Sequence, residues 1–137
     1  MDGQDIVVRD CTASCFGDAA DVRSGQDNGV GASGFRYWPD HPDYIGIALP
    51  MRCSGIRSLR KSPLPKLPWY WPVRVFAHET GKSVIAHVID YGPTAGLDSG
   101  AAIDLLPATV AALGLKWSKG LWQVDYRCIG AAKYMPK

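Results

Sequence analysis

The sequence predicts a single, mainly β domain that closes into a small barrel. Its 137 residues fit one domain and leave little room for a second. Its 15 glycines and 10 prolines imply frequent turns and argue against a helical bundle. Five or six segments have the length and apolar pattern of strands, whereas one segment has the pattern of a helix.

The first half of the chain contains two expected strands separated by loops. Residues 1–11 are expected to form an N-terminal extension, residues 12–17 a first strand and residues 44–49 a second. A loop rich in Asp, Gly, Ser and Asn covers residues 18–34. Residues 50–68 contain prolines and bases without periodicity, so we expect a long loop insertion there.

The clearest local pattern is a β-hairpin in the middle of the chain. Two alternating segments, residues 73–78 and 83–89, flank a four-residue loop at 79–82. The expected register places the following residues opposite one another: His78 and Ser83, Phe76 and Ile85, and Arg74 and His87. The alternation assigns one face to the core, formed by Val73, Val75, Ala77, Val84, Ala86 and Val88.

A helix and a final strand are expected in the last third of the chain. Residues 104–113 predict a short helix, with Asp104 near its start, Pro107 in its first turn and Gly114 at its end. Its buried stripe comprises Leu106, Val110 and Leu113. Residues 122–128 alternate and predict a strand whose inward side chains are Trp122, Val124, Tyr126 and Cys128.

The charge of the chain is nearly balanced, with a net charge of +2 and a pI near 8.4. Bases gather in the insertion at Arg52, Arg57, Arg60, Lys61 and Lys66. This one group is too small to indicate a nucleic-acid partner, and a flexible basic loop is the simpler interpretation. No apolar stretch approaches the roughly 20 residues that span a bilayer, so we expect no membrane span.

The N-terminus and the cysteines give information about the cellular compartment of the protein. The first residues lack the basic and apolar regions of a signal peptide. The four cysteines are Cys11, Cys15, Cys53 and Cys128. An even number allows a disulfide framework, typical of an oxidising compartment, while buried free thiols are the alternative. Because no Cys-x-x-Cys pair occurs, a zinc site is not expected.

Two motifs suggest ligands that the surrounding sequence does not support. Residues 29–34 match Gly-x-Gly-x-x-Gly, but no strand precedes them and no helix follows, so these glycines serve a loop. The acidic residues near position 20 lack the alternate spacing of a calcium loop. His78 and His87 fall on the solvent face of the hairpin. The sequence therefore predicts no metal and no cofactor.

Asp90 is the acid with the most suggestive position. It ends the hydrophobic run 84–89 and precedes Tyr91-Gly92-Pro93. A carboxylate at the end of a buried strand is partly desolvated, which raises its pKa and favours the protonated form near neutral pH. Protonation of a glycosidic oxygen requires such an acid. Asp104 is expected close by, and a turn-capping role is the alternative for Asp90.

Short motifs occur in order over residues 12–130: Ala13-Ser14-Cys15-Phe16-Gly17, Gly31-Ala32-Ser33-Gly34, Leu67-Pro68-Trp69, Thr80-Gly81-Lys82-Ser83-Val84, Val88-Ile89-Asp90-Tyr91-Gly92-Pro93 and Ala102-Ile103-Asp104-Leu105. Together they resemble the double-psi β-barrel domains of rare lipoprotein A, membrane-bound lytic transglycosylase A and expansins. The resemblance implies a six-stranded double-psi β-barrel with one or two short helices.

The resemblance also implies an extracytoplasmic polysaccharide ligand, often peptidoglycan. We expect a monomeric protein. In the family's lytic transglycosylases, one Asp protonates the glycosidic oxygen and then deprotonates the sugar's own 6-hydroxyl. Asp90 would inherit this role by its motif. Direct hydrolysis normally needs two carboxylates, and Asp104, Asp98 or Asp27 would be the second. Ile89 and Tyr91 stand where the family has Asn and Arg.

Aromatic side chains are candidates for stacking on sugar rings. Trp69 and Trp71 cluster beside the insertion and Tyr37 beside the glycine-rich loop, although core positions are the alternative. The expected substrate-binding set is completed by Ser33, His41 and Tyr91. Two other functions remain open: a non-catalytic, expansin-like polysaccharide-binding module, and a structural module of a phage or secretion apparatus. Each of the three functions places the protein outside the cytoplasm.

Overall fold

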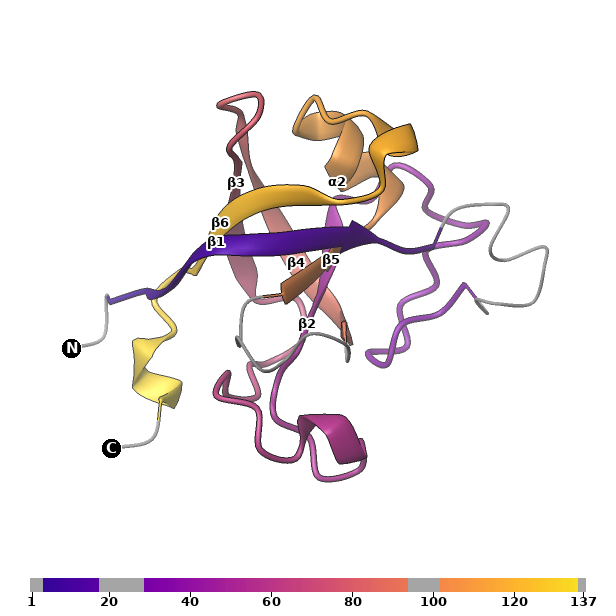
Figure 1. The fold of residues 1–137 in the computed structure, drawn as a ribbon. Helices are drawn as coiled ribbons and strands as arrows, with labels where there is room; N and C mark the ends of the chain where they lie inside the picture. The colour runs from indigo at the N-terminus through magenta and orange to yellow at the C-terminus, as the bar shows by residue number, and fades with distance from the viewer. Residues whose placement is uncertain (1–3, 18–28, 94–101, 136–137) are drawn as a thin grey trace.

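The computed structural model describes residues 4–17, 29–93 and 102–135. Six strands form one closed barrel in the order β1-β5-β2-β4-β3-β6 (Figure 1). The pairs β1–β5 and β2–β4 are parallel, and the other four pairs are antiparallel. The strands are β1 (Ile6–Cys15), β2 (Gly46–Leu49), β3 (Pro72–Ala77), β4 (Ser83–Tyr91), β5 (Ala102–Leu105) and β6 (Trp122–Cys128).

Within residues 4–17, 29–93 and 102–135, helical structure occurs only in short segments. Helix α2 (Pro107–Ala112) lies at the top of the barrel in Figure 1, and three 3-10 turns occupy Arg57–Leu59, Trp117–Lys119 and Ala132–Tyr134. The mainly β class and the six-stranded barrel are thereby confirmed. Among the described residues, no helix has the length and apolar character to cross a membrane.

The barrel interior is filled by alternate residues of the strands. In β3 and β6 the alternation is regular, so Val73, Val75 and Ala77 face inward together with Val124 and Tyr126. These side chains are fully buried or nearly so, and burying each large apolar one contributes about 1.5–3 kcal/mol. The predicted core face of the hairpin and the predicted inward face of residues 122–128 are confirmed.

The predicted register of the hairpin was wrong by two residues. Phe76 pairs with Ser83 and Arg74 with Ile85, so His78 lies in the loop instead of pairing with Ser83. The loop is closed by backbone bonds from Ala77 N–H to the carbonyl of Lys82 and from Gly81 N–H to the carbonyl of Ala77, both 2.9 Å. Because side chains alternate with a period of two, a shift of two residues leaves every side chain on its predicted face.

The predicted helix start at Asp104 was also wrong. Asp104 lies in strand β5, and the helix begins only at Pro107. Strand pairing explains the difference, since Asp104 is in register with Ser14 of β1 and with Ala48 of β2. The helix end at Gly114, with a φ of 70°, and the buried stripe of Leu106, Val110 and Leu113 agree with expectation.

The first strand begins earlier than predicted. Residues 6–11, expected within an N-terminal extension, form the first part of β1 and pair with β6, where Ile6 lies opposite Cys128. The register shifts between Val8 and Cys11, and Asp10 adopts a φ of 54° at this bulge. The bulge interrupts the apolar alternation, which is why the pattern failed to mark a strand here.

The insertion is a folded loop. Met51, Leu59, Leu64 and Leu67 are buried, and the N–H of Arg52 donates to the carbonyl of Leu64 at 2.7 Å. The Ser62 hydroxyl donates to the carbonyl of Pro50 and accepts from the N–H of Leu64. Figure 1 shows this segment below the barrel, next to the end of β2. The absence of strands there was predicted, whereas its apolar anchoring was not.

The cysteines correct another expectation. Among the four cysteines, Cys11, Cys15, Cys53 and Cys128, the structure shows no disulfide, so the suggested disulfide framework is not formed. Cys11 and Cys128 point into the barrel core on β1 and β6, where burial raises the pKa of each thiol to about 12. These two cysteines act as small apolar core residues.

Candidate functional site

Four residues form one row across four neighbouring strands. Ser14 of β1 is in register with Asp104 of β5, Asp104 with Ala48 of β2, and Ala48 with Asp90 of β4. Residues in register on adjacent strands point to the same face of a sheet. Because Ile103 and Leu105 face the barrel core, Asp104 and its row face outward. We call Ser14, Asp104, Ala48 and Asp90 the carboxylate row.

Asp104 is the more enclosed of the two acids. The Ser14 hydroxyl donates a hydrogen bond to its Oδ1. A Cβ added at Gly92 would lie 3.4 Å from its Oδ2, so the chain directly after β4 passes beside this carboxylate. Burial raises the pKa of Asp104, the negative charge of Asp90 raises it further, and the Ser14 hydrogen bond partly opposes both effects. Asp104 is therefore suited to hold a proton.

Asp90 sits in a different environment on β4. The backbone N–H groups of Ala32 and Tyr91 donate to its Oδ1 at 3.0 Å and 2.8 Å. Such donors favour the ionised form of a carboxylate. The sequence predicted Asp90 as the acid of the site; in the structure, burial raises the pKa of Asp104.

The glycine-rich loop reaches Asp90 through close backbone contact. The N–H of Ser33 donates to the carbonyl of Ile89 at 3.1 Å. A Cβ at Gly31 would lie only 2.3 Å from the oxygen of that carbonyl, so no other residue fits without a shift. The loop role predicted for the glycines at 29–34 is confirmed, and the loop supplies a donor to the site.

Two of the predicted substrate-binding residues, Tyr91 and Trp69, pack against the core at the end of β4. Tyr91 follows Asp90 directly, and its ring meets Trp69 edge to face with centroids 5.1 Å apart. The ammonium group of Lys66 lies 3.7 Å from the centroid of the Trp69 ring. Burial raises the pKa of Tyr91, and a hydrogen bond with Cys53 adds to the effect. The insertion thus packs its aromatic and basic side chains against the end of β4.

Two other predicted residues have packing and hydrogen-bond contacts of their own. Tyr37 is 4% exposed and packs with Ile89 and Leu106 on the outer side of the barrel wall. Trp71 donates its Nε1–H to the carbonyl of Ile129 at 2.8 Å and packs edge to face on Tyr134.

Ser33 and His41 have local partners. The hydroxyl of Ser33 accepts the N–H of Phe35 at 3.2 Å, which closes a turn beside Asp90. His41 stacks on Phe35 with ring centroids 4.9 Å apart. His41 also borders a pocket of about 140 Å³, which no residue of the carboxylate row lines. The structure therefore places Ser33 near the acids and His41 at a neighbouring hollow.

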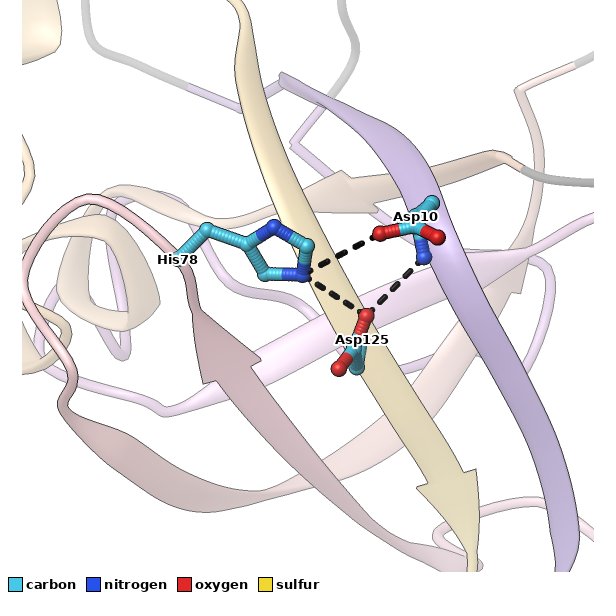
Figure 2. A group of neighbouring side chains, drawn as sticks. All are labelled: Asp10, His78 and Asp125. Carbon is cyan, nitrogen blue, oxygen red and sulfur yellow. Dashed lines mark hydrogen bonds and ion pairs between the residues drawn. The ribbon is translucent and has the colours of Figure 1, made fainter.

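Three side chains that the sequence did not connect meet on the opposite wall (Figure 2). Nε2 of His78 lies 2.7 Å from Oδ1 of Asp125 and 3.8 Å from Oδ1 of Asp10, whose own N–H donates to Asp125. Among the described residues, this is the one group of His, Cys, Asp or Glu side chains close enough to hold a metal ion, with ligand atoms within 4.8 Å of one another. These ion pairs and hydrogen bonds tie β1, β6 and the hairpin loop together.

Two solved structures have the same fold. A papain inhibitor from Streptomyces matches with a TM-score of 0.52 and 18% identity, over 91% of this chain and 94% of the inhibitor. A variant of the expansin of Clavibacter michiganensis, in complex with cellohexaose, matches with a TM-score of 0.51 and 15% identity.

The fold is a double-psi β-barrel. This confirms the fold that the short motifs implied. The chain covers 49% of the expansin's length, and 88% of this chain takes part in the match. No protein-family model and no curated protein matches the sequence. At such low identities the double-psi barrel establishes the architecture, and function has to be argued from the carboxylate row.

Proposed function

We propose that this double-psi barrel binds a polysaccharide across the carboxylate row and cleaves its glycosidic bonds, with Asp104 as the proton donor. The observation that supports the proposal is the pairing of two acids with different surroundings on one outward face. Burial and the charge of Asp90 raise the pKa of Asp104, while two backbone N–H groups donate to Asp90. Acids whose surroundings separate their protonation states are typical of acid–base catalysis.

The spacing of the row suits a sugar chain. Asp90 and Asp104 flank β2, so their Cα atoms lie two strand spacings apart, roughly 10 Å. Ala48, between them, has only a methyl side chain; it is 2% exposed, and a Cβ added at Gly92 would lie 3.9 Å from it. Glycosidases use carboxyl groups about 5–9.5 Å apart, a range that two Asp side chains on strands at this Cα spacing can reach.

The chemistry follows from the two environments. Protonated Asp104 gives its proton to the glycosidic oxygen as the bond to the anomeric carbon breaks. Asp90 accepts a proton from the nucleophile, and the nucleophile's oxygen forms the new bond to that carbon. If the nucleophile is water, a reducing end forms; if it is the sugar's own 6-hydroxyl, a 1,6-anhydro end forms. We propose peptidoglycan as the substrate, because the motif around Asp90 resembles that of lytic transglycosylases, and an extracytoplasmic site of action.

Cleavage is tested by mass spectrometry of the soluble products released from purified peptidoglycan. The intact chain is expected to release muropeptides, and Asp104→Asn is expected to reduce the rate by about 10²–10⁴-fold, the usual contribution of a general acid. Glu79→Gln is the matched control, since Glu79 pairs with Lys119 on the surface of the hairpin loop. Equal product release by wild type and Asp104→Asn would refute the mechanism.

A non-catalytic, expansin-like binding function is the second candidate. It is favoured by the structural similarity to an expansin that was solved with cellohexaose. It predicts that the chain sediments with insoluble glycan and releases no soluble product. Trp69→Ala is then expected to weaken sedimentation more than Trp71→Ala, because Trp69 packs on Tyr91, the residue after Asp90, while Trp71 packs on Tyr134.

A further inference from the structure

A pocket rich in arginine lies on the outer face of β1, β6 and β3. It has a volume of about 240 Å³ and is lined by Val7, Arg9, Arg74, Phe76, Ser83, Asp125, Tyr126 and Arg127. In the closed ring β1-β5-β2-β4-β3-β6, β6 lies opposite β2 of the carboxylate row, and no residue of the row lines the pocket. The pocket therefore belongs to a separate surface.

Two of these arginines are held against each other by the sheet itself. Arg74 of β3 is directly in register with Arg127 of β6. Side chains in this relation have Cβ atoms about 5 Å apart, and like charges there destabilise the sheet. Arg127 lies 3.5 Å from Asp5, whereas Arg9 and Arg74 form no ion pair within the described parts of the chain. Arg74 therefore faces the like charge of Arg127, and no acidic side chain in the described parts of the chain forms an ion pair with it.

The one acid in the pocket lining does not supply that partner. Asp125 is engaged by His78 and by the N–H of Asp10, as Figure 2 shows. These two hydrogen bonds are the main reason that the pKa of Asp125 is lowered, and the charge of Arg9 is the smallest contribution. The carboxylate of Asp125 therefore forms part of the wall and leaves the guanidinium groups to an external anion.

We propose that this pocket binds the oxyanion group of a small organic ligand. Guanidinium groups present several N–H donors in a plane, which match the oxygens of phosphate, sulfate and carboxylate groups. Phe76 is 38% exposed in the same pocket and offers an apolar surface to the organic part of the ligand. Ser83, opposite Phe76 in the register, contributes a hydroxyl to the lining. The bound anion neutralises the facing pair Arg74 and Arg127.

Thermal unfolding of the intact chain tests the proposal, with inorganic phosphate, phenyl phosphate and benzoate as probes at constant ionic strength. A probe that binds the pocket is expected to raise Tm above the value measured in sodium chloride at the same ionic strength, and the increase should saturate with probe concentration. Phenyl phosphate and benzoate distinguish a phosphate ligand from a carboxylate ligand. If no probe raises Tm beyond sodium chloride, the proposal is wrong.

Arg74→Gln gives a signature with two parts. Without a probe and at low salt, it is expected to raise Tm, because the repulsion with Arg127 is removed. It is also expected to lower the affinity for the probe about tenfold or more, since a charge-assisted hydrogen bond is lost. Arg57→Gln, at an exposed arginine of the insertion, is the matched control and should change neither value. An Arg74→Gln protein that keeps the full response to the probe would overturn the assignment.

Phe76→Ala separates the two halves of the pocket. It is expected to lower the affinity for phenyl phosphate and to leave the affinity for inorganic phosphate unchanged, because only phenyl phosphate has a ring to pack on Phe76. An equal loss of affinity for both probes would contradict the placement of the ligand's organic part against Phe76. The result is independent of glycan cleavage, since no residue of the carboxylate row is altered.

Discussion

The contact between Gly31 and strand β4 makes Gly31→Ala a sharp test of how the glycine-rich loop holds Asp90. The new Cβ would lie 2.3 Å from the carbonyl oxygen of Ile89, whereas real contacts begin at 3.0–3.4 Å. The loop must therefore move by roughly 1 Å. That shift breaks or stretches two hydrogen bonds, from Ser33 to Ile89 and from Ala32 to the Asp90 carboxylate.

The magnitude follows from the kinds of bond that are lost. A neutral hydrogen bond contributes about 0.5–1.5 kcal/mol and one to a charged group about 1.5–3 kcal/mol, so the free energy of unfolding should fall by about 2–4 kcal/mol. For a domain of this size, that corresponds to a decrease in Tm of about 10 °C. Glycan cleavage should fall as well, since Asp90 loses a donor that orients it.

Calorimetry and urea unfolding measure the effect, with Gly55→Ala as the matched control. Gly55 is exposed, and a Cβ there would meet nothing closer than the Cys53 sulfur at 4.0 Å. The control should therefore be neutral or slightly stabilising, because alanine restricts the unfolded chain. Equal stability of the two variants would refute the account of the loop contact.

Three further outcomes are expected. Because the pKa of Asp104 is raised in the folded state, its stabilising contribution is present below the unfolded pKa of about 3.9 and is lost as pH rises through the folded pKa. Asp104→Asn should therefore have a higher free energy of unfolding than wild type at neutral pH. Equal pH profiles of the two proteins in urea unfolding would contradict this. Asp125 has a lowered pKa, so its contribution to stability is present at neutral pH and lost as pH falls through the folded pKa. The fall in Tm on acidification should therefore be smaller in Asp125→Asn than in wild type. It should also be reduced, by a smaller amount, in His78→Gln, because His78 pairs with Asp125. Cys11 and Cys128 should resist iodoacetamide at pH 8 in the folded protein and react in guanidinium, and labelling of either in the native state, detected by peptide mass spectrometry, would contradict their burial.

Local patterns predicted the parts of the fold that neighbouring residues determine. The faces of β3 and β6 follow from alternation alone, so Val75 and Val124 were placed correctly inside the barrel. The hairpin register depends on loop-closing bonds around Gly81, which alternation does not contain. The start of β1 was missed because the bulge at Asp10 breaks the pattern.

The carboxylate row shows why the site was only partly predictable. Its motifs marked Asp90 and Asp104, but the segment around Asp104 is followed by Pro107 and was interpreted as a helix start. Pairing with Ser14, 90 positions away in the chain, made it a strand instead. The different surroundings of the two acids also arise from tertiary contacts, so the proposal that Asp104 holds the proton depends on the structure.

The central claim is that Asp104 carries the proton of a coupled acid pair. Titration of the side-chain carboxyl carbons by nuclear magnetic resonance, in wild type and in Asp90→Asn, tests this most directly. The account predicts that Asp104 titrates above the ordinary Asp value of about 3.9, and that Asp90→Asn lowers its pKa by removing a nearby negative charge. An Asp104 that titrates at or below the ordinary value, and does not respond to Asp90→Asn, would contradict it.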